Sequence, residues 1–442
     1  MLKPLILDIL FIVRIIKYNF MQNLKGKRLL ILGSSVWKDL IRSFADEYGV
    51  YLIFAGLYPA PLDDIADEYY RVDTTDRDIM IPFIKEHNIE GVYMGGSEFI
   101  ISHACEWINE VGLPCYCRKE QWEILQNKDL FKDLCIKFDL PVVPRFVIDI
   151  NNIASSVPEN SYPVITKPTD GSGSNGFSVC HNSNELIKGY KIAADVSPTQ
   201  SVICEKFVNN SGIVVFYSFS EGKMHFVLSE DKIPVKYEKQ GSYVAGLFTC
   251  PSIIEKEFRE RYDTKLSLLF SSIGIKEGTV WIEVFRDGDE FYFNEVGYRY
   301  GGSFSFYSVD YMSEVNQFYA DLYYAVSGDS KLFGFHSLIP KEISKGINYC
   351  IYPVHCNSGK IIEERGVDII KSKFTDQIVV VPHQKEIGDT IDDTGSFGQV
   401  ICLFHFVYST IEECHNIIRY IQDTYEVIDE NGCNIVNNKL LL

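Results

Sequence analysis

Strand-like and helix-like segments alternate over the first hundred residues, and this alternation restricts the fold more than any other feature of the chain. Three short apolar runs have the pattern of buried strands: KRLLILGSS (27–35), YLIFAG (51–56) and IEGVYMGGSE (89–98). Helix-like patterns such as VWKDLIRSFADEYG and RDIMIPFIKEHN fill the gaps between them. Strands that alternate with helices predict a parallel, doubly wound α/β sheet.

The pattern changes after about residue 210. Two segments alternate apolar and polar residues on both sides of a tight turn: GIVVFYSFSEGKMHFVLSEDK (212–232) and TVWIEVFRDGDEFYFNEVGYR (279–299). Such segments predict antiparallel hairpins. The tail from about residue 345 carries short strand patterns and one clear helix pattern, TIEECHNIIRYIQDTY. The chain is therefore expected to combine an α/β region with α+β regions.

The charge and cysteine content exclude some classes of protein. The formal net charge is -18. Because a nucleic-acid backbone requires a basic protein surface, no nucleic-acid partner is expected. Twelve cysteines are scattered along the chain without a C-x-x-C pair. This favours reduced thiols in a cytoplasmic protein over a disulfide framework or a zinc site.

Residues 1–20 are apolar but carry Asp8 and Arg14 in their middle. The uninterrupted apolar run of residues 9–13 is far too short to span a bilayer. Two interpretations stay open: an amphipathic surface helix, and an artefact of start-site choice with Met21 as the true start. No firm membrane association is expected.

A glycine-rich stretch, KPTDGSGSNG (167–176), contains the spacing G-x-G-x-x-G. A dinucleotide-binding loop with this spacing must lie between a strand and a helix. Here the flanking patterns are two strands, YPVITKP (162–168) and FSVC (177–180). The Gly-Lys-Ser/Thr of a P-loop and the H-R-D and D-F-G signatures of a protein kinase are also missing. The stretch therefore predicts either a mobile hairpin lid over a nucleoside triphosphate or a plain hairpin loop.

Charged residues precede and follow this loop at the ends of predicted elements. Lys128 begins a helix pattern in NKDLFK, and Lys167 ends the strand that enters the loop. Glu205 and Lys206 end a later strand pattern, QSVICEKFV. Taken singly, each of these residues has the pattern of a solvated surface charge.

Two glutamates, Glu283 and Glu295, lie on the two arms of the second predicted hairpin. Mg²⁺ prefers oxygen ligands and is often shared between one or two carboxylates and substrate phosphates. Two carboxylates that face each other across antiparallel strands can hold such an ion. Arg299 follows four residues after Glu295, and Gly301-Gly302 would let the backbone approach a ligand closely.

In chain order these features are a Lys, a Lys with its glycine loop, Glu-Lys, Glu, and Glu-x-x-x-Arg-x-Gly-Gly. This order resembles the ATP-grasp superfamily, and within it the carboxylate–amine ligase group. That group includes biotin carboxylase, the carbamoyl-phosphate synthetase large chain and L-amino acid ligases. Residues 112–144 are similar to the stretch that leads from the first domain of those enzymes into the first grasp lobe, and residues 394–432 to their C-terminal subdomain. The resemblance covers nearly the whole chain.

The resemblance implies a nucleotide site. Lys128 and Lys167 would contact the phosphates of ATP, and the glycine loop would be the lid that closes over them with backbone N–H groups. The lid residues concerned are Gly171, Ser172, Gly173, Ser174 and Gly176. Glu205 would accept a hydrogen bond from the adenine amino group or from a group near it. The hinge strand that contacts adenine would consist of Lys206, Phe207 and Val208.

The resemblance also implies a metal site and a catalytic arginine. Glu283 and Glu295 would hold Mg²⁺ or Mn²⁺, and Arg299 would stabilise the carboxyl phosphate or the transferring phosphoryl group. One departure affects the metal site, because Gly297 stands where the family usually has Asn. Gly297 has no side-chain oxygen, so the metal site would either have one ligand fewer or take that ligand from Asn294 or water. A second departure is Val214, which stands where a ribose-binding carboxylate would be expected.

The implied activity is an ATP-dependent ligation of a carboxylate to an amine through an acyl phosphate, with release of ADP and phosphate. The substrates would be small molecules of amino-acid, secondary-metabolite or surface-glycan type. Gly297 and Val214 favour one alternative, a non-catalytic ATP-binding protein that acts as a sensor or scaffold. A homodimer is left open. The predicted domains are an N-terminal extension (1–25), a pre-ATP-grasp α/β domain (26–120), a two-lobed ATP-grasp domain (121–330, lid lobe about 145–205) and a C-terminal α+β subdomain (331–442).

Overall fold

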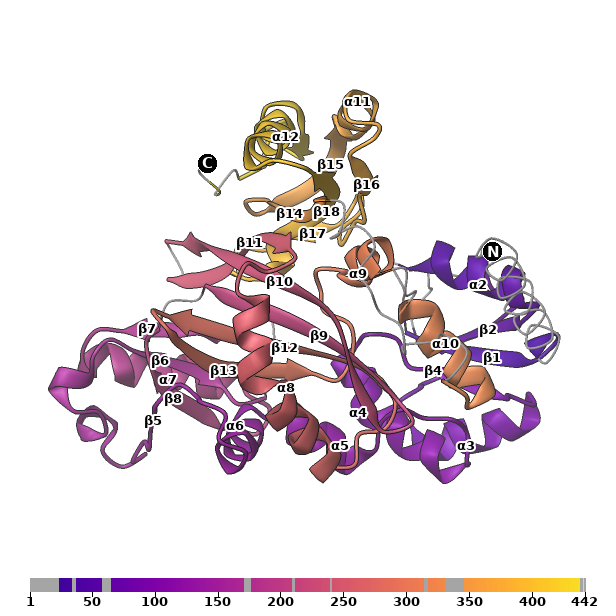
Figure 1. Ribbon diagram of the computed structural model, residues 1–442, viewed down its shortest axis with the longest axis horizontal. Coiled ribbons are helices and arrows are strands. Elements are labelled where there is room, and N and C mark those ends of the chain that lie inside the picture. The colour runs from indigo at the N-terminus through magenta and orange to yellow at the C-terminus, as the bar shows by residue number, and fades with distance from the viewer. Residues whose placement is uncertain are drawn as a thin grey trace, which may run out of the picture.

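The computed structural model describes residues 24–33, 37–57, 65–170, 176–208, 211–238, 241–313, 317–330, 346–437 and 440. Residues 171–175 of the predicted lid, and all but the last two residues of the predicted N-terminal extension, lie outside these ranges. Figure 1 shows an α/β region at one end of the molecule, a long sheet through its middle and the C-terminal region above that sheet. No helix in the described part of the chain combines the length and apolarity needed to cross a membrane.

The first region is a four-stranded parallel sheet in the order β3-β2-β1-β4, which confirms the predicted parallel arrangement. Its strands are β1 (Arg28–Leu32), β2 (Tyr51–Ala55), β3 (Glu68–Tyr70) and β4 (Gly91–Tyr93), and its helices are α2 (Lys38–Tyr48), α3 (Arg77–Glu86) and α4 (Glu98–Glu110). Helix α2 buries Ile41, Phe44, Ala45 and Tyr48, which is the spacing of one helical face. The loop between β4 and α4 lies at the carboxyl edge of this sheet, where ligands of α/β folds bind.

A small antiparallel sheet in the order β5-β8-β6-β7 follows two helices. Its elements are α5 (Lys119–Gln126), α6 (Lys128–Lys137), β5 (Arg145–Phe146), β6 (Val164–Pro168), β7 (Ser178–Cys180), α7 (Ser183–Val196) and β8 (Val202–Lys206). Strands β6 and β7 pair with each other on the two sides of the glycine-rich stretch. Its predicted strand-to-strand setting is therefore confirmed, and a dinucleotide-binding loop is excluded.

The central element is an eight-stranded sheet in the order β13-β12-β9-β10-β11-β14-β18-β16, and all its pairs are antiparallel. Its strands are β9 (Gly212–Ser220), β10 (Lys223–Tyr237), β11 (Ser242–Cys250), β12 (Gly278–Asp287), β13 (Glu290–Gly297), β14 (Asn348–His355), β16 (Ile378–Val380) and β18 (Val400–Tyr408). Both predicted hairpins, β9–β10 and β12–β13, are present. Since β14 pairs with β11, this sheet continues past residue 331, and the domain boundary there stays a prediction.

Helices and a second small sheet complete the fold. Helix α8 (Glu255–Ser272) follows β11, and α9 (Phe306–Ser313) and α10 (Gln317–Ser327) follow β13. The C-terminal region adds β15 (Gly359–Arg365), α11 (Val367–Lys373), β17 (Thr390–Ile391), α12 (Ile411–Thr424) and β19 (Glu426–Asp429). All twelve cysteines are free and ten are buried, as expected for reduced thiols used as small apolar side chains.

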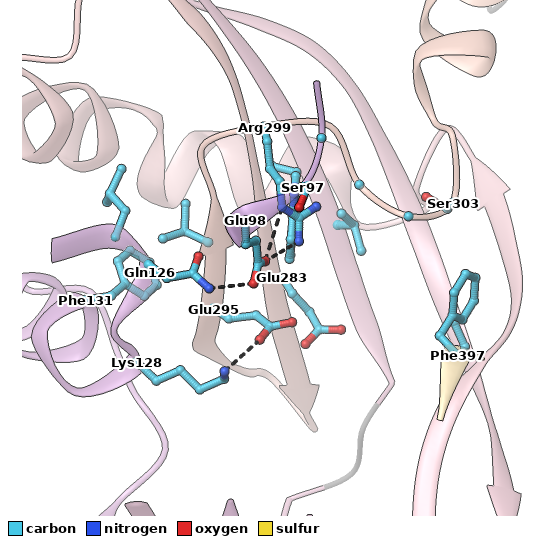
Figure 2. A pocket seen from close by; sticks show the side chains of 18 of the residues that line it. Ser97, Glu98, Gln126, Lys128, Phe131, Glu283, Glu295, Arg299, Ser303 and Phe397 are labelled. Atoms are coloured by element: carbon cyan, nitrogen blue, oxygen red, sulfur yellow. Dashed lines mark hydrogen bonds and ion pairs between the residues drawn. The ribbon is translucent and has the colours of Figure 1, made fainter. Parts of the chain in front are cut away.

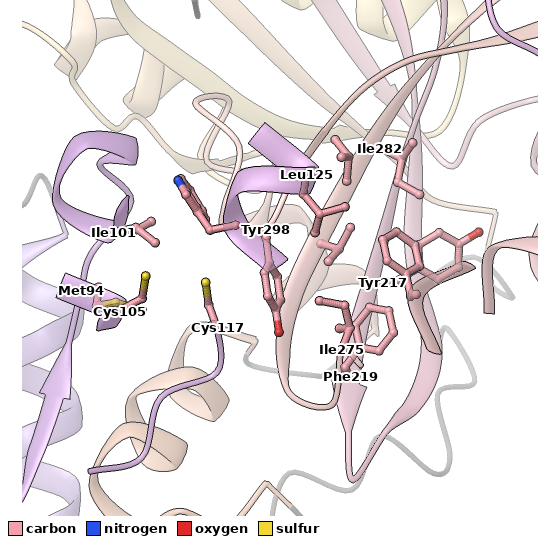
Figure 3. Close-up of a cluster of buried hydrophobic side chains, with 14 of the residues drawn as sticks. Met94, Ile101, Cys105, Cys117, Leu125, Tyr217, Phe219, Ile275, Ile282 and Tyr298 are labelled. Carbon is pink, nitrogen blue, oxygen red and sulfur yellow. The ribbon is translucent and has the colours of Figure 1, made fainter. Parts of the chain in front are cut away.

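One hydrophobic core joins the α/β region to the central sheet (Figure 3). Ile101 and Cys105 of α4 and Leu125 of α5 belong to the same buried cluster as Ile282 of β12 and Tyr298. The Tyr298 hydroxyl lies within hydrogen-bond distance of two backbone carbonyls, those of Tyr116 before α5 and Glu277 before β12, and can donate to either. Because interiors of this kind are close-packed, the core fixes the loop after β4 against the end of β13.

Candidate active site

A cavity of about 840 Å³ lies between the loop after β4, helices α5 and α6, and strands β9 to β13 (Figure 2). This size is ordinary for a small-molecule site. The charged residues that line it are Glu98, Lys128, Asp170, Lys232, Glu283, Glu295 and Arg299. Its aromatic walls include Trp122, Phe131, Phe216, Phe248, Trp281 and Phe397.

A β-bulge turns the two predicted metal-binding carboxylates toward this cavity. From the turn of the β12–β13 hairpin the register is regular as far as Val284, which pairs with Phe293, but the next pair is Glu283 with Glu295. Asn294 is therefore the extra residue of a bulge. If the register continued without the bulge, Glu283 would pair with Asn294, and the Glu295 side chain would point to the other face of the sheet. Two hard oxygen ligands on one face fit a divalent cation.

Two lysines lie near this carboxylate pair, Lys128 beside Glu295 and Lys167 beside the neighbouring Asn294. Asn127 caps α6 with its side chain and so fixes Lys128 as the first helical residue. The Lys128 Nζ lies 3.7 Å from a Glu295 carboxylate oxygen (Figure 2). Lys167, near the end of β6, donates to the Asn294 side-chain oxygen at 2.8 Å. The structure thus brings Lys128, Lys167 and the two glutamates close together, and their roles toward ATP and a metal ion stay predictions.

Glu205 forms a buried charge cluster with two lysines. Its carboxylate, at the end of β8, accepts from Lys132 and lies 2.9 Å from the Lys167 Nζ. Burial opposes ionisation of Glu205, but the two lysines outweigh it and hold the pKa of this carboxyl to about 2. Burial lowers the pKa of Lys132 to about 8. The predicted contact of Glu205 with adenine stays a prediction, because this carboxylate is engaged by lysines here.

The hinge residues Lys206 and Phe207 use their backbone N–H groups within the protein. These groups donate to the backbone carbonyls of two prolines on neighbouring segments, at 2.9 and 3.0 Å. A base at this segment would therefore have to use other backbone groups. The Phe207 ring lies 5.9 Å, centroid to centroid, from Tyr243, which lines the cavity. Recognition of adenine by Lys206, Phe207 and Val208 stays a prediction.

Gly176 is the member of the predicted lid that the structure describes. Its φ is +75°, and a Cβ there would lie 3.1 Å from Pro168 and from Val196. Both facts favour glycine at this position. Gly171, Ser172, Gly173 and Ser174 lie outside the described residues, so the lid itself stays a prediction.

Arg299 lies at the opposite end of the cavity from Lys128 (Figure 2). Its guanidinium donates to the carboxylate of Glu98, the first residue of α4, and Gln126 donates to the other oxygen of Glu98 at 2.6 Å. The guanidinium carbon also lies 5.5 Å from the centre of the Trp281 ring, a cation–π distance. Glu98 and Gln126 are not among the site residues predicted from the sequence. The signal for Glu98 is a Ser-Glu helix start at the carboxyl end of a predicted parallel strand, whereas Gln126 stands at the end of α5.

Four cations act on Glu295. Burial would raise the pKa of its carboxyl, but Lys128, Lys167, Lys232 and Arg299 hold that pKa below its usual range. Glu295 is therefore ionised at neutral pH, as a cation ligand must be.

Glu283 is held by two partners next to Glu295. It accepts from Lys232 of β10 and, at 2.6 Å, from the Asn294 side-chain nitrogen. The Asn294 amide thus joins Glu283 to Lys167, to which it presents its oxygen. The site is a connected set of charges rather than a group of solvated side chains.

A buried glutamate supports the loop that closes one end of the cavity. Glu230 of β10 accepts from the hydroxyls of Ser305 and Ser308, at 3.1 and 3.0 Å, and Ser303 of the cavity wall bonds to Ser305. Burial raises the pKa of Glu230 to about 7, against the effect of these hydroxyls.

This pKa predicts a pH-dependent stability. The folded state binds a proton at Glu230 between about pH 4.5 and 7 that the unfolded state releases, so this group lowers stability as pH rises through that range. Glu230→Gln is expected to raise the free energy of unfolding by about 1–3 kcal/mol at pH 8 and to leave it unchanged at pH 4.5. Urea denaturation at both pH values, with exposed Glu290→Gln as control, measures this. Equal effects at the two pH values would contradict it.

A second group of metal-ligand types lies in the C-terminal region, outside the cavity. Ligand atoms of Glu364, His383 and Cys402 lie within 4.8 Å of one another. Glu364 accepts from Tyr425 at 2.6 Å and pairs with His383 at 2.7 Å, and the Cys402 thiol donates to Tyr425. These hydrogen bonds already satisfy the group, which explains it as a structural network.

One segment of the chain matches a known protein family. The family model of the carbamoyl-phosphate synthase L chain ATP-binding domain matches residues 127–215, which run from α6 into β9. A formate-dependent phosphoribosylglycinamide formyltransferase of Prochlorococcus marinus is 26% identical over 190 residues. That match covers 41% of this chain and 48% of the relative, so the chain spans about half the length of that relative.

Solved structures extend the likeness to most of the chain. An L-amino acid ligase from Bacillus licheniformis superposes with a TM-score of 0.74 at 18% identity, over 92% of this chain and 100% of that one. The biotin carboxylase domain of a 2-oxoglutarate carboxylase from Hydrogenobacter thermophilus superposes with a TM-score of 0.72 at 16% identity, over 93% and 91%. The segment that holds Lys128, Lys167 and Glu205 is thus similar to the ATP-binding domain of the carbamoyl-phosphate synthase L chain, and most of the chain shares the fold of an L-amino acid ligase and of a biotin carboxylase domain.

Proposed function

We propose that this enzyme activates the carboxylate of a small molecule with ATP and joins it to an amine, with release of ADP and phosphate. One observation carries the proposal. Lys128 lies beside Glu295 in a cavity that Glu283 also lines, and Lys167 donates to Asn294, the residue next to Glu295. Cations beside a pair of carboxylates are what a nucleoside triphosphate with its divalent cation requires.

The residues divide into those for phosphates and those for the cation. Lys128 and Lys167 would neutralise the triphosphate, and Glu283 and Glu295 would hold Mg²⁺ or Mn²⁺. When bound, the cation would supply neutralisation of the charge that develops during phosphoryl transfer. The biotin carboxylase domain among the similar structures was solved with MgADP, which supports this assignment.

The chemistry would proceed in two steps. A substrate carboxylate oxygen attacks the γ-phosphorus of ATP, the bond from that phosphorus to the bridging oxygen breaks, and ADP leaves. The amine nitrogen then attacks the carbonyl carbon of the acyl phosphate, loses a proton, and displaces inorganic phosphate. Arg299 would stabilise negative charge on the acyl phosphate, as preorganised donors do at sites of developing charge. A closed lid would keep water from hydrolysing this intermediate.

The walls of the cavity favour certain acids. Phe248, Trp281 and Phe397 present apolar surface beyond the charged groups. An acid with an apolar or aromatic side group would bury that surface, at about 25 cal/mol for each Å² removed from water. Amino acids and small metabolites of this type are the proposed acyl donors.

The test is ADP formation from ATP and Mg²⁺ with pooled amino acids and small carboxylic acids, in the presence and absence of pooled amines. The proposal expects ADP release that requires both an acid and an amine, and a new amide in the mass spectrum. ATP binding without acid-stimulated ADP release would instead favour the alternative, a sensor or scaffold without ligase activity.

A further inference from the structure

Trp281 and Gly297 face each other across the β12–β13 hairpin, directly beside the two carboxylates. Side chains two residues apart on a strand point to the same face. Trp281 therefore shares a face with Glu283, and a side chain at position 297 would share a face with Glu295. The two pairs of positions, 281 with 297 and 283 with 295, are neighbours on one surface.

The indole ring occupies the space above Gly297. A Cβ at Gly297 would lie 2.2 Å from Trp281 Nε1 and 2.3 Å from Cε2. Real Cβ atoms do not approach other heavy atoms this closely, so no side chain fits at 297 while the indole stays in place. Trp281 Nε1 has no hydrogen-bond acceptor among the described residues. Packing on Gly297 and Arg299, rather than a hydrogen bond, thus sets the position of the ring.

We propose that Trp281 and Gly297 are a matched pair that restricts the protein ligands of the divalent cation to Glu283 and Glu295. The proposal rests on the proposed function for the identity of the cation. The Asn294 amide is already engaged, because its oxygen accepts from Lys167 and its nitrogen donates to Glu283, so we do not count it among the cation ligands. The remaining positions around the cation are then left to water and nucleotide oxygens.

The consequence is an order of binding. With two protein ligands the cation is held weakly by the protein alone, and it arrives together with the nucleotide. Trp281 also lies against Arg299, so the residue that excludes a third ligand positions the arginine at the other end of the cavity. Trp281 is thus a positioning residue.

The first experiment is a double-mutant cycle on thermal stability, which needs no metal. Gly297→Asn alone is expected to lower Tm by about 2–6 °C, because the new side chain collides with the indole. In a Trp281→Ala background the same change is expected to cost nothing, since the space is then open. An equal cost of Gly297→Asn in both backgrounds, or none in either, overturns the pairing.

The second experiment measures Mn²⁺ binding by electron paramagnetic resonance without nucleotide. The double variant Trp281→Ala/Gly297→Asn, which has both space and a third oxygen ligand, is expected to bind Mn²⁺ about 10-fold more tightly than wild type. The matched control is Trp281→Ala/Gly297→Leu, which fills the space without an oxygen and is expected to bind as wild type does. Equal affinity in the two double variants overturns the ligand restriction.

The failure of this proposal differs from the failure of the proposed function. If neither the wild type nor any variant binds Mn²⁺, even with a non-hydrolysable ATP analogue, the cation site of the proposed function is wrong. The double-mutant cycle on Tm then still decides whether the Trp281 side chain excludes a side chain at position 297.

Discussion

The Glu295→Gln variant is expected to lose about 10³-fold in ATP-dependent turnover while it stays folded. Glu295 is ionised at neutral pH because four cations lower its pKa, and it lies opposite Glu283 in the cavity. An amide of the same shape removes the charge that would hold the divalent cation. Removal of one preorganised electrostatic group of this kind costs about 10²–10³-fold, and loss of a metal ligand adds to it.

The loss is measured as the rate of ADP formation with an acid and an amine that the wild type accepts. The matched control is Glu290→Gln, an exposed carboxylate at the other end of the same strand, which is expected to keep full activity. The circular dichroism spectrum and Tm of both variants check that the fold is intact. Turnover of Glu295→Gln at the wild-type rate would refute the assignment of this residue to the cation.

The Glu205→Gln variant is expected to lose about 3–5 kcal/mol of unfolding free energy at pH 7. Lys132 and Glu205 are fully buried, and Lys167 is nearly so. An amide cannot neutralise the two ammonium groups, so the substitution leaves buried charges without their counter-ion. Urea denaturation measures the change, and a loss of less than 1 kcal/mol would show that the cluster contributes little to stability.

The Glu205 carboxylate also makes the free energy of unfolding depend on pH in the acid range. Its folded pKa of about 2 is below the unfolded value near 4.5, so its contribution is complete above about pH 4.5 and falls as pH decreases toward 2. The stability difference between wild type and Glu205→Gln should therefore shrink in acid. In the double variant Lys132→Met/Glu205→Gln one buried charge is gone, and the loss relative to wild type should be smaller than for Glu205→Gln alone.

Local patterns were sufficient to predict the elements that carry the site. Turn residues with alternating strands identified the β12–β13 hairpin, and strand–helix alternation identified the parallel sheet. The bulge at Asn294 could not be predicted from the sequence, because one inserted residue does not visibly change the pattern of apolar residues. Yet that bulge puts Glu283 and Glu295 on one face. The order of strands in the central sheet was equally hidden, since it depends on pairings between distant segments.

Lys132 and Glu98 show why the site could be predicted only in part. Lys132 is four residues after Lys128 on the same helix, and from sequence it has the pattern of a surface lysine. Its burial depends on Glu205, which lies 73 residues away. Glu98 has the pattern of a helix start, and only the fold brings Arg299 to it. At Gly297 the sequence does not reveal that Trp281, on the opposite strand, occupies the space of a side chain.

The central claim is that a carboxylate oxygen of the substrate attacks ATP, and isotope transfer tests it most directly. The protein is incubated with ATP, Mg²⁺, pooled amines and a pool of amino and carboxylic acids labelled with ¹⁸O in the carboxylate. The released phosphate is then analysed by mass spectrometry. An acyl-phosphate route predicts one ¹⁸O atom in each phosphate released with an amide, and no labelled phosphate with Glu295→Gln. Amide formation with unlabelled phosphate, or phosphate released only by water, would contradict the account.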